Sequence, residues 1–118
     1  IGICLGAQLL TNSSEEANDS PGLGLINARC ISLTKHPKYK GNIPRIGWSG
    51  VESSLDDSFY FVHSFYIEIL DKNLEVTFST DGVTAMVRDK NIVAMQFHPE
   101  KSDISGKNIV ISFINDYV

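Results

Sequence analysis

A cysteine between two glycines, at the point where an apolar run changes character, constrains the fold of this chain most. The chain begins IGICLGAQLL, and residues 1–5 have the apolar composition of a short buried strand. A helical pattern follows from Gly6 to about Thr11. A buried strand that turns directly into a helix is typical of α/β folds, so we expect this chain to belong to that class.

The rest of the chain consists of strand-like segments and polar loops, and it closes with a second helix. The expected strands cover residues 28–34, 46–51, 59–63, 74–80, 83–88 and 92–97. Loops are expected at residues 12–22 and 36–44, and Asp81-Gly82 is a typical hairpin turn. The closing helix carries one apolar stripe, formed by Ile109, Val110, Phe113, Ile114 and Tyr117.

The composition is that of an ordinary globular domain. Of the 118 residues, 42% are hydrophobic and 20% are charged, and the formal net charge of −4 argues against a nucleic-acid-binding surface. Three lysines of one loop come nearest to a basic cluster and are expected to be solvated, namely Lys35, Lys38 and Lys40. No apolar run reaches the roughly 20 residues that a membrane-spanning helix needs.

The two cysteines, Cys4 and Cys30, are too few for a disulfide framework. Neither has a second Cys or His at the short spacing that a metal site needs. We therefore expect a cytoplasmic protein that binds no metal.

Gly2, Cys4 and Gly6 have the spacing of a nucleophile elbow, with cysteine in place of the serine of many hydrolases. An elbow strains the backbone of its nucleophile, and side chains two residues before and after it would clash, which explains the glycines. The turn is expected to expose the sulfur, to direct the Leu5 N–H at an oxyanion, and to favour the thiolate at the helix N-terminus. A buried structural cysteine is the alternative.

His98 is the preferred base for such a thiol. It follows the apolar strand at 92–97, and Glu100 lies on the same side of a chain that Pro99 is expected to keep extended. A carboxylate beside an imidazole fixes its tautomer and stabilises the imidazolium. The plainer interpretations are a hydrogen-bonded strand-end histidine and a surface carboxylate. His63, also at a strand end, is the alternative base, whereas His36 lies in a polar loop and is expected to be solvated.

The segments GICLGAQLL and QFHPEKS together resemble the class I, triad-type glutamine amidotransferases. The resemblance covers the whole chain, with both motifs in the family's order. Within the family the chain is most similar to the glutaminase subunits of imidazole glycerol phosphate synthases, which act in histidine biosynthesis. The similar features are the missing histidine between Gly6 and Gln8, the segment IPRIGW at 43–48, the segment FYFVHSFY at 59–66, and the Lys-Ser after Glu100.

The resemblance implies a doubly wound, mainly parallel, flavodoxin-like α/β sheet with Cys4 at its elbow. It implies that Cys4, His98 and Glu100 hydrolyse glutamine to glutamate and ammonia through a γ-glutamyl thioester, without a cofactor. Leu5 would supply an oxyanion donor. The implied substrate-binding residues are Gly6, Gln8, His63, Ser64 and Phe65.

The resemblance also implies a partner, a (β/α)8-barrel cyclase that receives the ammonia within a heterodimer. Trp48, Tyr60 and Lys101 match positions that face this partner. From the residues alone, the two aromatic side chains would be interpreted as part of the core and the lysine as solvated.

Two departures from the family pattern leave alternatives open. Phe65 stands where the family usually has tyrosine. The family also has a long N-terminal half before the elbow, so residues 1–118 are expected to form the C-terminal part of the amidotransferase domain. The alternatives are a paralogous subunit for nucleotide-sugar amidation in surface polysaccharide synthesis, a free-standing γ-glutamyl cysteine hydrolase, and a truncated chain without activity.

Overall fold

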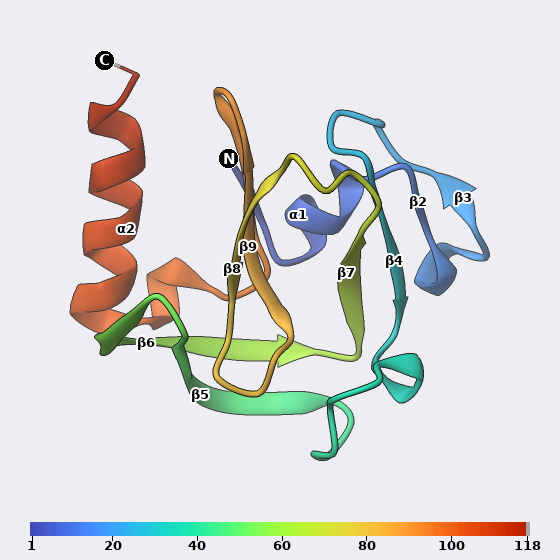
Figure 1. Cartoon of the computed structure of the whole chain (residues 1–118), viewed down its shortest axis with the longest axis horizontal. Helices are drawn as coiled ribbons and strands as arrows, with labels where there is room; N and C mark the ends of the chain where they lie inside the picture. Colours follow the sequence, from blue (N-terminus) through green and yellow to red (C-terminus); the bar gives the residue numbers. More distant parts are fainter. Residues whose placement is uncertain (118) are drawn as a thin grey trace.

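The computed structural model describes residues 1–117, which form strands, two α-helices and three short 3-10 turns (Figure 1). The strands are β1 Gly2–Ile3, β2 Ser13–Ser14, β3 Ser20–Pro21, β4 Ala28–Ser32, β5 Arg45–Val51, β6 Ser54–His63, β7 Phe65–Ile69, β8 Glu75–Phe78, β9 Thr84–Asp89 and β10 Ile92–Met95. The helices are α1 Leu5–Leu9 and α2 Asp103–Asn115, and the 3-10 turns are Glu15–Ala17, Leu33–Lys35 and Pro99–Lys101.

The strands form three sheets, and the expected α/β class is confirmed. One sheet has the order β1-β10-β9-β8, a second has the order β3-β2-β4-β7, and β5 pairs with β6 alone. Within residues 1–117, parallel pairing is confined to β1 with β10 and β2 with β4, and the other five pairs are antiparallel. The β1–β10 pair matters for function, because both strands run toward the segments that carry the expected triad.

Two of the three apolar clusters join the sheets and helices around the site. One joins α1 to the sheets on either side of it through Ala7, Cys30, Ile67 and Val87. The other packs the β5–β6 pair against β9 and β10 through Phe59, Phe61, Val93, Met95 and Phe97. Figure 1 shows β5 and β6 lying across the end of the β8–β9 hairpin, with α2 at one side of the molecule.

Helix α2 buries a narrower stripe than the sequence predicts. Ile109, Val110 and Phe113 pack against the second cluster as expected. Ile114 and Tyr117 stay almost half exposed, at 46% and 47%. The Tyr117 hydroxyl instead accepts a hydrogen bond from Arg88 Nη2 at 2.9 Å, so the end of the helix is fastened by polar contacts.

Three local expectations are corrected by the structure. Strand β7 was not expected. It follows β6 after a one-residue break at Ser64, and it pairs with β4. The expected burial of residues 1–5 is also wrong for the described chain, because β1 is an edge strand and Ile1 and Leu5 are 53% and 71% exposed. Finally, His36 is only partly exposed, since Nδ1 accepts the backbone N–H groups of Lys38 and Tyr39.

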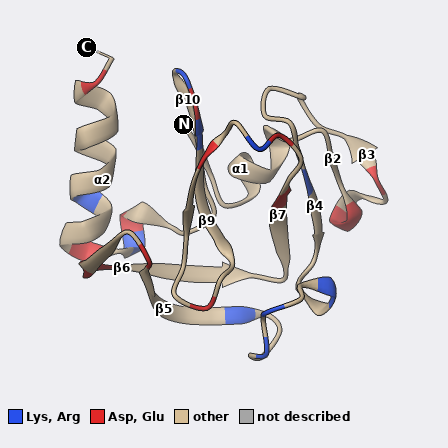
Figure 2. Ribbon diagram, viewed as in Figure 1, with Lys and Arg blue, Asp and Glu red and all other residues tan. Residues whose placement is uncertain are grey.

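The expected hairpin at Asp81-Gly82 and the lysine loop are both found. The turn places Gly82 at φ +84°, and β8 pairs antiparallel with β9 on either side of it. Lys38 and Lys40 are exposed, and Lys35 forms an ion pair with Glu15 at 2.5 Å. Figure 2 shows basic and acidic segments interspersed along the ribbon. Among residues 1–117, no helix has the length and apolar character needed to cross a bilayer.

Candidate active site

Cys4 occupies a strained turn between β1 and α1. Its φ of +51° and ψ of −107° lie outside the regions that ordinary residues adopt, as a nucleophile elbow requires. A Cβ on Gly2 would lie 2.6 Å from the Gly6 carbonyl oxygen, so glycine is required there. The steric clash that the sequence predicts at Gly6 is absent, because a Cβ there would have no neighbour within 4 Å.

The Cys4 sulfur is half-buried at the edge of a cavity. The backbone N–H of Cys4 donates to the Met95 carbonyl at 2.7 Å, which extends the β1–β10 pairing to Cys4. The thiol lies 3.8 Å from the Val62 carbonyl oxygen, and Gln96 Nε2 lies 4.0 Å from Sγ.

The expected bias toward thiolate is wrong for this structure. Burial raises the pKa of the Cys4 thiol, while a hydrogen bond from the Leu5 N–H acts in the opposite direction. The carboxylates of Glu16 and Glu100 raise the pKa further. The net effect is a raised pKa, which favours the thiol over the thiolate.

His98 and Glu100 form the expected pair. His98 Nδ1 donates to Glu100 Oε2 at 3.1 Å. The pair does not form through an extended chain, as the sequence predicts, because Pro99–Lys101 is a 3-10 turn. The carboxylate holds the proton on Nδ1 and leaves Nε2 free to accept another.

Cys4 and His98 lie at the same end of a parallel strand pair. Ile3 is paired with Met95, Cys4 follows directly, and His98 follows three residues later. Within residues 1–117, no hydrogen bond joins the Cys4 sulfur to the imidazole of His98. Contacts between catalytic groups often tighten only when substrate is bound.

His63 is excluded as the alternative base by its contacts. The ring is buried, its Nδ1 donates to the Phe65 carbonyl at 2.8 Å, and its Nε2 lies 3.2 Å from Arg45 Nη1. Burial lowers the pKa of His63 to about 4, with the charge of Arg45 acting in the same direction. Both ring nitrogens are therefore occupied, and the ring cannot take the proton of Cys4.

A cavity of about 290 Å³ adjoins the sulfur and contains several expected substrate-binding residues. Its lining residues are Cys4, Leu5, Gln8, Glu16, Pro44, Val62, His63 and Ser64. Gln8 is anchored there, since Nε2 donates to the Phe65 carbonyl at 3.2 Å and to Gln96 Oε1 at 3.4 Å. Phe65 contributes this carbonyl, and neither Phe65 nor Gly6 lines the cavity.

The expected partner-facing residues form one cluster on the surface. Trp48 and Tyr60 face each other across the β5–β6 pair, with ring centroids 6.0 Å apart, and the Lys101 ammonium lies 5.9 Å from the Tyr60 ring centroid. Trp48 is 51% exposed. The interpretation of Trp48 as a core residue is therefore wrong, and the cluster is open to another molecule.

Sequence reasoning missed four residues near the site: Glu16, Arg45, Asp81 and Gln96. Gln96 carried a usable signal, because it is a fully buried amide in an otherwise apolar segment just before Phe97 and His98. The other three residues carried no such signal, since their positions near the site depend on how segments far apart in the sequence fold together.

The comparisons with known proteins agree with this arrangement. The sequence profile of the family "Glutamine amidotransferase class-I" matches residues 1–115. This chain belongs to that family. A solved structure titled as a glutamine amidotransferase superimposes with a TM-score of 0.69 at 23% identity, over 97% of this chain and 58% of that one, which supports the fold.

Two curated relatives have names that specify a type of amidotransferase. Imidazole glycerol phosphate synthase subunit HisH 2 of Methanococcus maripaludis is 41% identical, and the match covers 97% of this chain and 61% of that protein. The HisH subunit of Gloeothece citriformis is 36% identical, and the match covers 98% of this chain and 60% of that protein. The chain thus spans about three fifths of the length of these relatives.

Proposed function

We propose that this chain carries the glutamine-hydrolysing site of an imidazole glycerol phosphate synthase, acting in the cytoplasm in histidine biosynthesis. The observation that carries the proposal is the His98–Glu100 pair beside β10, which runs parallel to the strand that leads into Cys4. The similarity to proteins named as HisH subunits supports this choice among amidotransferases.

In the first half of the proposed reaction, the Cys4 sulfur attacks the side-chain amide carbon of glutamine while its proton moves to Nε2 of His98. Proton transfer accompanies attack in this scheme because the raised pKa of Cys4 favours the thiol. The Leu5 N–H stabilises the oxyanion that forms. The intermediate then collapses to a γ-glutamyl thioester, and the imidazolium of His98 gives its proton to the departing ammonia.

In the second half, His98 takes a proton from water as the water oxygen attacks the thioester carbon. The Cys4 thiolate leaves and recovers the proton from His98, which releases glutamate. Glu100 stays ionised and stabilises the imidazolium in both halves.

The cavity beside Cys4 is proposed to hold the amino-acid end of glutamine. The Glu16 carboxylate in its lining is suited to the α-ammonium group, because a hydrogen bond between an ammonium and a carboxylate is stronger than one between neutral groups. Gln8 and the backbone of residues 63–65 supply polar groups for the α-carboxylate side. Gly6 places no side chain at its own position in α1.

We further propose that the ammonia passes to a (β/α)8-barrel cyclase bound in a heterodimer, which makes imidazole glycerol phosphate and the aminoimidazole carboxamide ribotide. The exposed cluster of Trp48, Tyr60 and Lys101 supports this, since tryptophan and tyrosine are enriched at protein interfaces. The cluster is also connected to the site, because the His98 N–H donates to the Tyr60 carbonyl at 2.9 Å.

The test is glutamate release by the purified protein, alone and with a cyclase of this class supplied with its own substrate. We expect low activity alone and a rise with the loaded cyclase, and complete loss in Cys4→Ser. Cys30→Ser is the matched control, because Cys30 is buried in β4 and does not line the cavity. Full activity without a partner would identify a free-standing hydrolase instead.

A further inference from the structure

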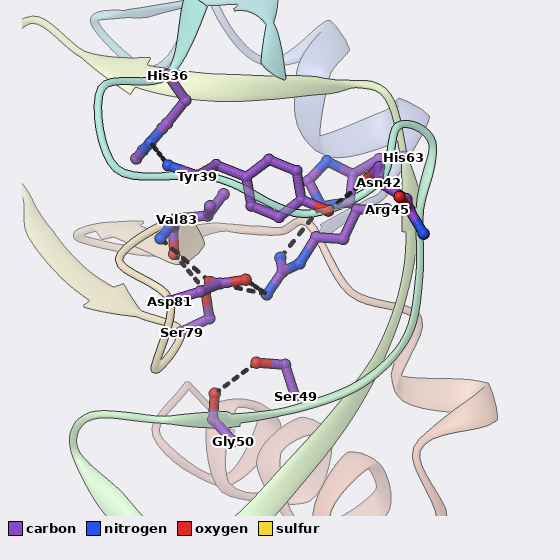
Figure 3. Close-up of polar contacts among 10 residues, drawn as sticks. All are labelled: His36, Tyr39, Asn42, Arg45, Ser49, Gly50, His63, Ser79, Asp81 and Val83. Carbon is purple, nitrogen blue, oxygen red and sulfur yellow. Dashed lines mark hydrogen bonds and ion pairs between the residues drawn. The ribbon is translucent and has the colours of Figure 1, made fainter. Parts of the chain in front are cut away.

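Arg45 is a buried cation at the start of β5, and it contacts His63 without lining the cavity. It is 6% exposed, and its guanidinium carbon lies 3.9 Å from the centroid of the Phe61 ring. A buried arginine needs charged or polar partners, since an unpaired buried charge is strongly unfavourable. Figure 3 shows the guanidinium between the imidazole of His63 and the carboxylate of Asp81.

Asp81 provides the countercharge from the β8–β9 turn. Arg45 Nη2 lies 3.0 Å from both oxygens of this carboxylate. The turn is itself fastened, because the Ser79 hydroxyl contacts Asp81 and the Val83 carbonyl (Figure 3). The hairpin turn therefore fixes the position of the guanidinium.

The other end of the guanidinium determines the tautomer of His63. Arginine only donates hydrogen bonds, so His63 Nε2, 3.2 Å from Arg45 Nη1, must accept. The ring proton then lies on Nδ1, which donates to the Phe65 carbonyl at 2.8 Å. The same carbonyl accepts from Gln8 Nε2, so one backbone oxygen holds both His63 and Gln8 at the cavity.

We propose that Arg45, anchored by Asp81, is a positioning residue for glutamine: it holds His63 in the Nδ1-protonated tautomer and thereby orients the Phe65 carbonyl and Gln8. The inference rests on the proposed function, because it assigns the binding of glutamine to the cavity beside Cys4. Arg45 does not line that cavity and acts only through His63. Burial also keeps His63 uncharged at neutral pH.

The test compares Arg45→Gln and Asp81→Asn with Arg29→Gln in the purified protein. Arg29 is the matched control, because its ion pair with Glu68, at 2.8 Å, joins two strands away from the cavity. We expect Arg45→Gln to raise the KM for glutamine roughly tenfold, the scale of one lost charged hydrogen bond, with kcat changed less than about threefold. Asp81→Asn changes KM in the same direction by less, and Arg29→Gln leaves both constants unchanged.

Nitrogen NMR of His63 gives a readout that a general loss of stability does not move. We expect one Nδ1-protonated tautomer in the wild type and in Arg29→Gln, and a mixture in Arg45→Gln. Arg45→Lys keeps one donor and restores the single tautomer in part. If Arg45→Gln does not fold, Asp81→Asn decides, because its carboxylate is partly exposed.

A wild-type KM in Arg45→Gln or Asp81→Asn would overturn the inference alone, with or without a fall in kcat. A single tautomer of His63 in Arg45→Gln would also contradict it. If the wild type releases no glutamate even with the loaded cyclase, the proposed function fails and the assignment of Arg45 to glutamine binding fails with it.

Discussion

The imidazole of His98 and the carboxylate of Glu100 meet across one 3-10 turn, with Nδ1 and Oε2 3.1 Å apart. The turn is held from outside, because the Ser102 hydroxyl donates to the His98 carbonyl at 2.6 Å and accepts from the Tyr60 N–H at 2.9 Å. The His98 N–H in turn donates to the Tyr60 carbonyl. His98 is therefore fixed to β6, the strand that also contributes Val62 and His63 to the cavity.

Only one of the two thiols is expected to react with a glutamine-like electrophile. Cys4 lies at the cavity, whereas Cys30 is 1% exposed and burial raises its pKa to about 11. Because the pKa of Cys4 is also raised, its alkylation by a small neutral reagent should accelerate steadily above neutral pH, without a plateau near pH 7. Peptide mapping after labelling measures this, and label on Cys30 with none on Cys4 contradicts it.

The two strand-end histidines should separate in kinetics. We expect His98→Ala to lower kcat about 10²- to 10⁴-fold, the usual effect of losing a general base. His63→Ala should mainly raise the KM for glutamine, because its ring only orients the cavity wall. His36→Ala is the control, since His36 caps a loop outside the site. A loss of turnover in the His63 variant with retention in the His98 variant would reverse the assignment.

Stability should fall in mild acid because of His63. Its pKa is about 4 in the folded chain and near 6.5 when unfolded, so between these values the unfolded state binds more protons. The free energy of unfolding therefore rises with pH from 4 to 6.5, and the contribution of this group amounts to at most roughly 3 kcal/mol. Urea unfolding at pH 4, 5 and 7 tests this against His63→Asn, which should lose that slope. Equal slopes in both proteins would rule out the effect.

The sequence predicted the strained turn at Cys4 and the contact between His98 and Glu100 better than it predicted their surroundings. Gly2, Cys4 and the His98–Glu100 pair are recognisable because each depends on neighbours within a few residues. The pKa of Cys4 was not predictable, since it depends on burial and on Glu16 and Glu100, which fold toward the sulfur from separate loops.

Long-range contacts also explain the remaining differences. Arg45 meets Asp81 across 36 residues, and neither residue type indicates this pairing by itself. Strand β7 was missed because only Ser64 separates it from β6, and a lone serine is not a strong turn signal. The exposure of Trp48 follows from the isolation of the β5–β6 pair, which a local pattern does not reveal.

Partner stimulation should depend on the exposed aromatic cluster. We expect Trp48→Ala to lose most of the rise in glutaminase activity caused by a loaded cyclase, while the low basal rate persists, because Trp48 lies outside the cavity. Leu23→Ala removes an equally exposed apolar side chain, 59% accessible, from a loop elsewhere, and it should keep the stimulation. Titration of the cyclase at saturating glutamine measures both. Equal loss of stimulation in the two variants would show that the cluster is not part of the interface.

The two glycines of the elbow should respond differently to alanine. In Gly2→Ala the new Cβ would lie 2.6 Å from the backbone oxygen of Gly6 and 2.7 Å from Leu10 Cδ1, so the turn that holds Cys4 must shift. Overpacking of this kind typically costs about 1–3 kcal/mol, and we expect a lower Tm together with slower alkylation of Cys4. Gly6→Ala meets nothing within 4 Å and stands within helix α1, where alanine is favoured, so Tm should stay level or rise. Thermal unfolding followed by circular dichroism compares the two variants directly. A Gly2→Ala protein as stable and as reactive at Cys4 as the wild type would show that the elbow does not need the glycine before the nucleophile.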